Sequence, residues 1–349
     1  MFRKLLFKPL RGLWNILIWR VIPYAAFLFS RVVRRSYRQA VFAWPDTLAL
    51  VGPRIVLFVH FDSGHNVRPY VIEYLAGLQA AGLSVLFVSN AGSLRPEAIE
   101  QIKPFCAGIL IRRNIGYDFV AMREGLAHFG LPRADTELLI LANDSVYGPL
   151  RPLDEMISKF DFGQADLWGA TDSWQARYHL QSYFLAAGPA LLHHPAWTKF
   201  WAQVEPVPSK RWVIAKYEVG ITQWMLRESL RCAAVWPYQD LMHKIDPEAL
   251  PPGASSYEAD TDPVVTMRRI QMRRIRIGYV NRTAQNPTSD LWRQLLNAGF
   301  PFLKRELLRD NPTAVSDIVD WRLVVQATSA ADVGTIERDL QRQVRNQAP

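Results

Sequence analysis

The chain has few cysteines and lacks the compact motifs of several large enzyme classes. Its 349 residues include only Cys106 and Cys232, far apart and in no metal or redox spacing. Two such cysteines fit small core residues in a reducing compartment. No Walker loop, Gly-x-Gly-x-x-Gly, Gly-x-Ser-x-Gly or His-Glu-x-x-His occurs. The sequence therefore gives no support to a P-loop NTPase, a dinucleotide-dependent dehydrogenase, an α/β-hydrolase or a zincin protease.

Acidic residues are absent from the first 40 positions, which carry nine basic ones. The whole chain has 41 basic and 32 acidic residues, so the remainder holds 32 of each sign and the net charge of +9 lies in the leader. A neutral body behind a basic leader argues against nucleic acid as the partner. It favours an anionic membrane surface instead.

The leader also contains an apolar, aromatic-rich stretch at residues 12–30 whose only charge is Arg20. Its 19 residues are marginal for a spanning helix, Arg20 would be costly at the bilayer centre and Pro23 would kink the helix. We therefore expect residues 1–45 to form an amphipathic helix that lies in the membrane interface. A true span and a helix docked on the protein itself are the alternatives.

The body of the chain alternates strand and helix patterns. Strands are expected at 54–61, 83–88, 108–111, 138–142, 166–170 and 183–187, with helices at 67–81, 97–102, from about 117 onward and at 195–204. This order predicts an α/β fold whose mostly parallel sheet is flanked by helices. We assign the core to residues 46–245, a segment completing the site to 246–320 and a polar helical tail to 321–349.

Polar residues follow three of the expected strands. They are Asp62-Ser63, the segment 112–118 and Asn143-Asp144-Ser145. Because parallel strands bring their carboxyl ends to one edge, these groups are expected to converge on a phosphate-bearing ligand. In the middle group, Arg112 and Arg113 would add positive charge and a helix start would add free N–H groups.

Asp144 is the candidate metal ligand of this edge. Its carboxylate, with the neutral oxygens of Asn143 and Ser145, suits Mg²⁺, which binds one or two carboxylates plus substrate phosphates. The alternative is that the triplet forms an Asx-turn and caps the next helix. Similarly, Asp118 could be an ordinary helix N-cap.

Glu218 is the carboxylate best placed to act as a general base near the sheet edge, because it lies where a helix opens after Lys216 and Tyr217. The alternative is that Glu218 only complements the dipole of that helix.

Several motifs, in the same order along the chain, resemble the rhamnan synthesis protein F family of bacterial polysaccharide biosynthesis. They include Arg-Asn-Ile-Gly-Tyr-Asp-Phe at 113–119 and Asn-Asp-Ser-Val-Tyr-Gly-Pro at 143–149. The match continues at 168–172, 179–184, 286–288, 291–292 and 299–304. The similarity extends over about residues 54–312.

The resemblance implies a glycosyltransferase with a GT-A-like (Rossmann-type) fold and a nucleotide-sugar donor such as dTDP-rhamnose. Asn143-Asp144-Ser145 then takes the place of the Asp-x-Asp metal motif, with Asn143 replacing its first carboxylate. Ser289 stands where the family often has a histidine, which leaves a C-terminal metal ligand unassigned.

On this resemblance Asp144 would orient a divalent metal (Mg²⁺ or Mn²⁺) and the donor diphosphate. The residues that would bind the donor are Asp62, Arg113, Asn114, Gly116, Asp118, Asn143 and Ser145. Those that would line the side of the glycan or lipid-linked acceptor are His179, Gln181 and Tyr183. Glu218 or Asp172 would deprotonate the acceptor hydroxyl. The expected location is the cytoplasmic face of the bacterial inner membrane.

Two other function classes remain open. The missing first carboxylate also fits a binding or scaffold protein of a polysaccharide assembly machine that keeps the fold without turnover. Nucleic-acid binding would need the leader and the arginines at 268, 269, 273, 274 and 276, and the neutral body argues against it.

Overall fold

The protein is known from a computed structural model that describes residues 40–46, 51–243, 245 and 262–347, together with 21, 24 and 25. Most of the predicted membrane-associating leader lies outside these residues, as do residues 246–261, the first part of the predicted segment 246–320. The part of the leader that is described ends in strand β1 (Ala40–Trp44), at an edge of the central sheet. Within the described residues no helix is both long and apolar enough to cross a bilayer.

The core of the fold is a nine-stranded sheet with the order β1-β4-β3-β2-β5-β9-β7-β10, and β8 pairs with β7. The other strands are β2 (Arg54–His60), β3 (Ser84–Ser89), β4 (Gly108–Arg112), β5 (Leu138–Asn143), β7 (Leu167–Ser173), β8 (His179–Leu180), β9 (Phe184–Ala187) and β10 (Cys232–Trp236). The predicted α/β fold, with a central sheet between helices, is confirmed.

The parallel part of the sheet consists of β4, β3, β2 and β5, and β10 runs parallel to β7. Strands β1, β8 and β9 are antiparallel to their neighbours. For β9 the reason is the short connection: residues 174–183 contain no helix between β7 and β9. A parallel return needs a crossover of a dozen or more residues, usually a helix. The sheet is therefore more mixed than the sequence pattern predicted.

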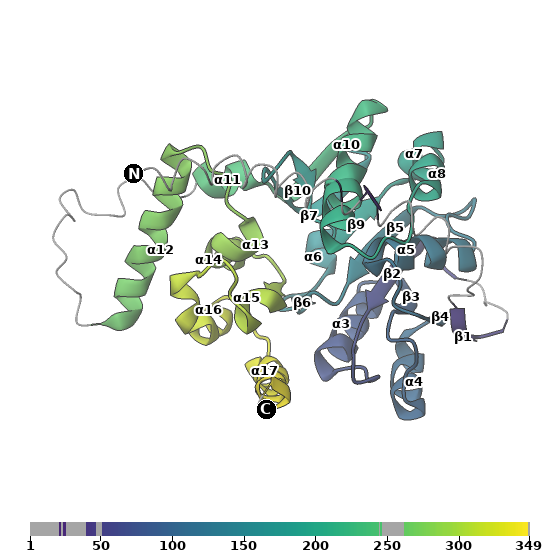
Figure 1. Ribbon diagram of the computed structural model, residues 1–349, viewed down its shortest axis with the longest axis horizontal. Coiled ribbons are helices and arrows are strands. Elements are labelled where there is room, and N and C mark those ends of the chain that lie inside the picture. Colours follow the sequence, from purple (N-terminus) through teal and green to yellow (C-terminus); the bar gives the residue numbers. More distant parts are fainter. Residues whose placement is uncertain are drawn as a thin grey trace.

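Helices cover both faces of the sheet (Figure 1). On one face α3 (Pro69–Ala80), α4 (Pro96–Ile102) and α6 (Asp154–Ile157) pack with the C-terminal helices in one apolar core. On the other face α5 (Tyr117–His128), α7 (Pro189–Leu192), α8 (Pro195–Ala202) and α10 (Val219–Arg227) form a second core. Strands β2, β3, β4 and β5 are buried from both sides, which explains why they read as continuous apolar runs.

The chain after residue 262 forms a group of helices beside the sheet, on the left in Figure 1. They are α12 (Pro263–Val280), α13 (Pro287–Asp290), α14 (Trp292–Asn297), α15 (Arg305–Arg309), α16 (Trp321–Thr328) and α17 (Val333–Gln347). A short strand β11 (Leu303–Lys304) pairs with β6 (Val146–Tyr147), directly after the Asn-Asp-Ser triplet. This pairing joins the C-terminal group to the edge of the sheet where the polar clusters lie.

Candidate functional site

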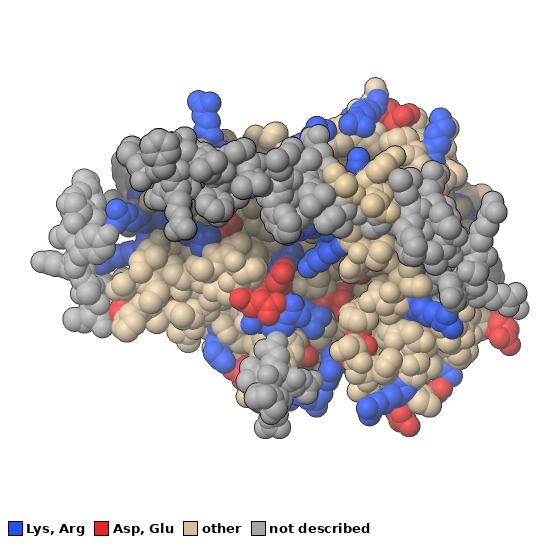
Figure 2. Space-filling model, viewed as in Figure 1, with Lys and Arg blue, Asp and Glu red and all other residues tan. Residues whose placement is uncertain are grey.

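A polar cleft of about 980 Å³ lies at the carboxyl ends of β2 and β5 and extends between the sheet and the C-terminal helices. Figure 2 shows acidic and basic side chains close together in this hollow. The predicted site residues that line it are Asp62, Asp118, Asn143, Asp144, Ser145, His179, Gln181, Tyr183 and Glu218. Chain segments more than 150 residues apart in sequence therefore meet at one place, as the predicted sheet edge required.

The Asn-Asp-Ser triplet forms an Asx-turn. The Ser145 N–H donates to Asn143 Oδ1 at 3.1 Å, and the Ser145 hydroxyl donates to the same oxygen at 2.5 Å. The alternative interpretation is therefore right about the Asx-turn but wrong about the helix cap, because the chain next enters β6. The Asn143 amide nitrogen donates to Asp118 Oδ2 at 3.1 Å. This turn commits Asn143 to internal hydrogen bonds and leaves the carboxylate of Asp144 at the cleft.

Asp144 lies between the end of β2 and the C-terminal segment. Its Oδ2 accepts a hydrogen bond from the Phe61 N–H at 3.3 Å and lies 3.7 Å from Arg305 Nη1. Arg305 Nη1 also donates to the Asp144 carbonyl oxygen at 2.8 Å. Arg305 was not predicted as a site residue, because the matched motif at 299–304 ends one residue before it. The β6–β11 pairing brings it to the site.

Asp118 is not the N-cap of α5. Gly116 takes that position with a left-handed φ of 84°, and Asp118 lies in the first turn. Burial, followed by the negative charges of Asp144 and Glu218, raises the pKa of Asp118 to about 7 from its usual 3.8. Asp118 is therefore partly protonated near neutral pH, and three carboxyl groups share this part of the cleft.

The raised pKa of Asp118 predicts a pH-dependent stability. Because the folded-state pKa lies above the unfolded one, the stabilisation is complete below about pH 4 and is lost as pH rises through about 7. Asp118→Asn mimics the protonated acid, so its free energy of unfolding should match wild type at pH 4 and exceed it by up to about 4 kcal/mol at pH 8. Urea denaturation at both pH values measures this. Exposed Asp135→Asn is the control, and a difference independent of pH would contradict the assignment.

Glu218 ends a π-helical turn at Ile214–Glu218, which leads directly into α10. Single π-helical turns often occur at functional sites. Lys210, Ile214 and Glu218 all line the cleft at four-residue spacing. The Ser182 N–H donates to Glu218 Oε1 at 3.5 Å, so the carboxylate faces the segment between β8 and β9. This position suits contact with an acceptor more than complementing a helix dipole.

On the predicted acceptor side, internal hydrogen bonds fix the side chains. The Thr171 hydroxyl donates to Gln181 Oε1 at 2.7 Å and lies 2.7 Å from the Tyr183 hydroxyl. The Gln181 amide nitrogen donates to Asn286 Oδ1 at 3.2 Å. The ring of His179 bonds the Arg177 carbonyl oxygen at 2.8 Å. Burial raises the pKa of Tyr183 well above its usual value, so its hydroxyl stays neutral.

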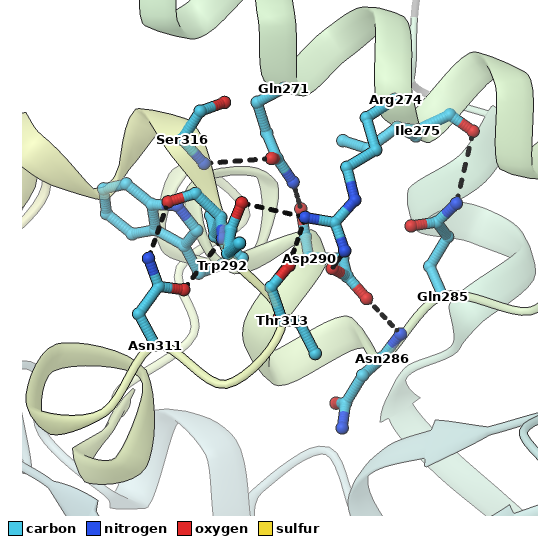
Figure 3. Close-up of polar contacts among 12 residues, drawn as sticks. Gln271, Arg274, Ile275, Gln285, Asn286, Asp290, Trp292, Asn311, Thr313 and Ser316 are labelled. Atoms are coloured by element: carbon cyan, nitrogen blue, oxygen red, sulfur yellow. Dashed lines mark hydrogen bonds and ion pairs between the residues drawn. The ribbon is translucent and has the colours of Figure 1, made fainter.

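Asn286, which also lines the cleft, is placed by the network in Figure 3. Its N–H donates to Asp290 Oδ2 at 2.8 Å, and Arg274 of α12 lies 3.7 Å from Asp290 Oδ1. Gln271 of the same helix donates to the Asp290 carbonyl oxygen at 3.0 Å and accepts from the Ser316 N–H at 3.3 Å. Helix α12 thus holds the Asn-Pro-Thr turn against the sheet edge.

Four predicted site residues do not line the cleft. Arg113 and Asn114 are exposed in the loop after β4. A Cβ on Gly116 would lie 2.4 Å from Val120 Cγ2 and 2.8 Å from Pro206 Cα, so glycine is required there by packing as well as by φ. Asp172 accepts the N–H of Tyr238 at 2.6 Å, at the start of α11 (Tyr238–His243).

Burial raises the pKa of Asp172 to about 6.

The positive charge expected from Arg112 is also unavailable to a ligand. Its side chain is fully buried, pairs with Glu124 at 2.7 Å and donates to Asn90. The interpretation of Arg112 as a phosphate-facing residue was wrong, because a buried charge needs internal partners.

The side chains of the cleft could bind a divalent metal only together with a ligand that supplies further oxygen atoms. In the described part of the chain, no group of three or more His, Cys, Asp or Glu side chains could hold a metal ion. Asp144 and ionised Asp118 provide carboxylates, whereas the carbonyl oxygen of Asn143 is used by Ser145. Mg²⁺ commonly binds one or two carboxylates and completes its shell with water and phosphate oxygens. These residues fit that arrangement.

Comparison with known proteins identifies one family. A family model described as rhamnan synthesis protein F matches residues 85–268, more than half of the chain. The virulence protein VirA of Vibrio anguillarum is 29% identical over 217 residues, covering 61% of this chain and 66% of VirA. The uncharacterized protein y4gN of Sinorhizobium fredii is 29% identical over 153 residues, covering 43% of this chain and 40% of y4gN. The chain thus matches less than two thirds of either relative.

Similarity to solved structures is weak. A putative nucleotide-diphospho-sugar transferase from Desulfovibrio desulfuricans aligns with a TM-score of 0.34 and 15% identity, covering 53% of this chain and 80% of its own. A mannosyltransferase from Pyrobaculum calidifontis, in complex with GDP-Man and Mn²⁺, aligns with a TM-score of 0.35 and 13% identity, covering 96% and 91%. Similarity at this level does not establish a shared activity.

Proposed function

This chain belongs to the rhamnan synthesis protein F family, and on that basis we propose that it is a glycosyltransferase with a GT-A-like core. It would transfer a sugar from a nucleotide-sugar donor to a bacterial surface polysaccharide or lipopolysaccharide, with dTDP-rhamnose as a candidate donor. The observation that supports this most is the meeting of Asp118, Asp144 and Glu218 in one cleft at the carboxyl ends of parallel strands. Nucleotide ligands bind at such edges.

In the proposed reaction Asp144 and Asp118 share one role and Glu218 has another. Asp144, with Asp118 beside it, would hold a divalent metal together with the donor diphosphate. The metal, when bound, would supply positive charge against the departing nucleotide. Glu218 would accept the proton of the acceptor hydroxyl as that oxygen attacks the anomeric carbon. Asp172 is the weaker candidate for this step, because its carboxylate binds the Tyr238 N–H outside the cleft.

The acceptor is proposed to lie against His179, Gln181 and Tyr183, which line the cleft next to Glu218. We also propose that the enzyme works at the cytoplasmic face of the inner membrane, held there by its leader. The support for this location is the basic, aromatic-rich composition of the first 40 residues. A glycan or lipid-linked acceptor would be presented at the same surface.

A scaffold protein without turnover is the second candidate. It is favoured by Asn143, whose amide replaces a carboxylate and is already engaged by Asp118 and Ser145. Such a protein would bind the nucleotide-sugar and leave it intact. Both candidate functions require that the cleft binds a nucleotide-sugar, so a binding experiment tests the site for both. Only the enzyme would break the nucleotide-sugar down, so a measurement of its turnover separates the two.

Nucleotide binding is the first test of the proposed site. Thermal unfolding of the full chain is followed with UDP, GDP, dTDP and CDP, each with Mg²⁺, with Mn²⁺ and with EDTA. One nucleoside diphosphate should raise the Tm by several degrees, because a ligand at about 100 times its Kd adds about 2.7 kcal/mol to the free energy of unfolding. The matching nucleoside is the control and should give no shift. The absence of a shift with every diphosphate would contradict the proposal.

A further inference from the structure

The side chain of Arg305 is held in the cleft by two aromatic rings and a backbone oxygen. Its guanidinium carbon lies 4.5 Å from the centre of the Tyr70 ring and 5.7 Å from that of Tyr147. Nη1 donates to the Asp144 carbonyl oxygen at 2.8 Å. The side chain is 18% exposed and contributes to the cleft wall. Arg305 is therefore a fixed charge, preorganised before any ligand arrives.

Among the described residues, the hydrogen-bonding capacity of Arg305 is only partly used: Nη1 donates to the Asp144 carbonyl oxygen, and the guanidinium also bonds the Tyr147 hydroxyl. The carboxylates of Asp144 and Asp339 each lie 3.7 Å from one of its terminal nitrogens, too far for a hydrogen bond. Its Nε is buried and has no hydrogen-bond partner in the part of the chain that the structure describes. The other two arginines of the cleft are closely paired: Arg68 with Asp62 at 2.5 Å and Arg309 with Asp310 at 2.6 Å. Arg305 is thus the cleft arginine most available to an anion.

Asp339 reaches this site from the last helix of the chain. It is buried, and its Oδ2 accepts hydrogen bonds from the Tyr147 hydroxyl at 2.8 Å and from Gln343 at 2.7 Å. Helix α17 itself is tied to α3 by the Thr335 hydroxyl, which donates to Glu73 at 2.7 Å. The residues predicted as a polar tail therefore form a wall of the cleft.

The carboxylate of Asp339 affects the orientation of the Arg305 guanidinium. It attracts Nη2, while Asp144 faces Nη1 on the other side. Asp144 and Asp339 are the two carboxylates that pair with Arg305 among the described residues, so without Asp339 the attraction of the guanidinium toward Asp144 would be unopposed. That pair would neutralise the charge of Asp144 and use the guanidinium fork internally. Asp339 thus keeps both Arg305 and Asp144 available to a ligand.

We propose that Arg305 is the residue of the cleft that binds the diphosphate group, and that Asp339 on α17 is its positioning residue. The planar guanidinium fork matches two phosphate oxygens, which explains a preference for a diphosphate over a neutral sugar. The inference rests on the proposed nucleotide-sugar function, but it concerns anion binding and not turnover. It makes the C-terminal helix part of the donor site.

Inorganic pyrophosphate tests this directly, because it carries the diphosphate without base or sugar. Its Kd for the full chain is measured by calorimetry with Mg²⁺, for wild type, Arg305→Gln, Arg305→Lys and Asp339→Asn. We expect Arg305→Gln to weaken binding by at least tenfold, Arg305→Lys to restore part of the loss and Asp339→Asn to weaken binding about fivefold. Arg95→Gln and Asp332→Asn are the controls, because both residues are exposed and neither lines the cleft.

The double variant Arg305→Gln/Asp339→Asn tests whether Asp339 acts by positioning Arg305 or whether its replacement weakens binding by disturbing the fold. If Asp339 acts through Arg305, the double variant should bind pyrophosphate no more weakly than Arg305→Gln alone. Fully additive losses, or wild-type binding by Arg305→Gln, would overturn the inference. Loss of binding in Arg305→Gln without any nucleotide-sugar turnover by wild type would refute the proposed function and leave this inference standing. Turnover that is unaffected by Arg305→Gln would refute the inference alone.

Discussion

Replacing Asp144 with asparagine is expected to reduce nucleotide-sugar turnover by about 10²–10³-fold while leaving the Tm of the protein within about 2 °C of wild type. The side chain keeps its size and an oxygen that can accept the Phe61 N–H, so the Asx-turn should persist. What is lost is the negative charge that would hold the metal and the diphosphate. The measurement is release of nucleoside diphosphate from a panel of nucleotide-sugars.

Asp135→Asn is the matched control for this variant. Asp135 is an exposed acid shortly before β5, at the opposite edge of the sheet from Asp144, so its replacement should leave turnover unchanged. If Asp144→Asn releases nucleoside diphosphate as fast as wild type, Asp144 has no part in the mechanism. A large fall in Tm together with lost turnover would show that its role is structural.

Replacing Glu218 with glutamine is expected to lower kcat by about 10²–10⁴-fold and to leave the Kd of the nucleoside diphosphate unchanged within about threefold. An amide cannot accept the proton of the acceptor hydroxyl, whereas the diphosphate is bound by other residues. The Ser182 N–H can still donate to the amide oxygen, so the π-helical turn should be kept. Steady-state transfer to an acceptor and calorimetry with the diphosphate measure the two effects.

Glu228→Gln is the control for Glu218, because Glu228 is exposed at the far end of the same helix. The competing assignment is Asp172, whose pKa is raised by burial to about 6. Unchanged kcat in Glu218→Gln, together with lost transfer in Asp172→Asn, would move the base to Asp172. Equal losses in kcat and in diphosphate binding would show that Glu218 binds the donor instead.

The strands that carry the site could be predicted because each is a buried apolar run ending in polar residues. The runs that became β2 and β5 are examples, and their ends place Asp62 and Asp144 in one cleft. The antiparallel direction of β9 was not predicted, because an apolar run of four residues carries no information about its direction. The absence of a helix pattern between β7 and β9 was the signal in the sequence that indicated an antiparallel β9.

The C-terminal half of the site could not be predicted, because it depends on contacts between distant parts of the chain. Arg305 and Asp144 are 161 residues apart, and Tyr147 and Asp339 are 192 apart. Local patterns cannot specify such pairs. The only sequence signal was the basic pair Lys304-Arg305 after an apolar run. Gly116 was predicted to bind the donor, whereas its left-handed φ and its packing against Val120 and Pro206 required coordinates.

The membrane-associating role of the leader stays a prediction, since residues 1–39 lie almost entirely outside the described part of the chain. Its basis is the charge distribution: all of the net +9 charge lies in the first 40 residues.

The most direct test of the central claim is an experimental structure of the full chain with Mg²⁺ and the nucleoside diphosphate that gives the largest rise in Tm. We predict that the two phosphates lie between Asp144 and Arg305, with Glu218 on the far side of the sugar position. A diphosphate bound elsewhere, for example on the arginines of α12, with Asp144 and Arg305 making no contact to it, would contradict the account.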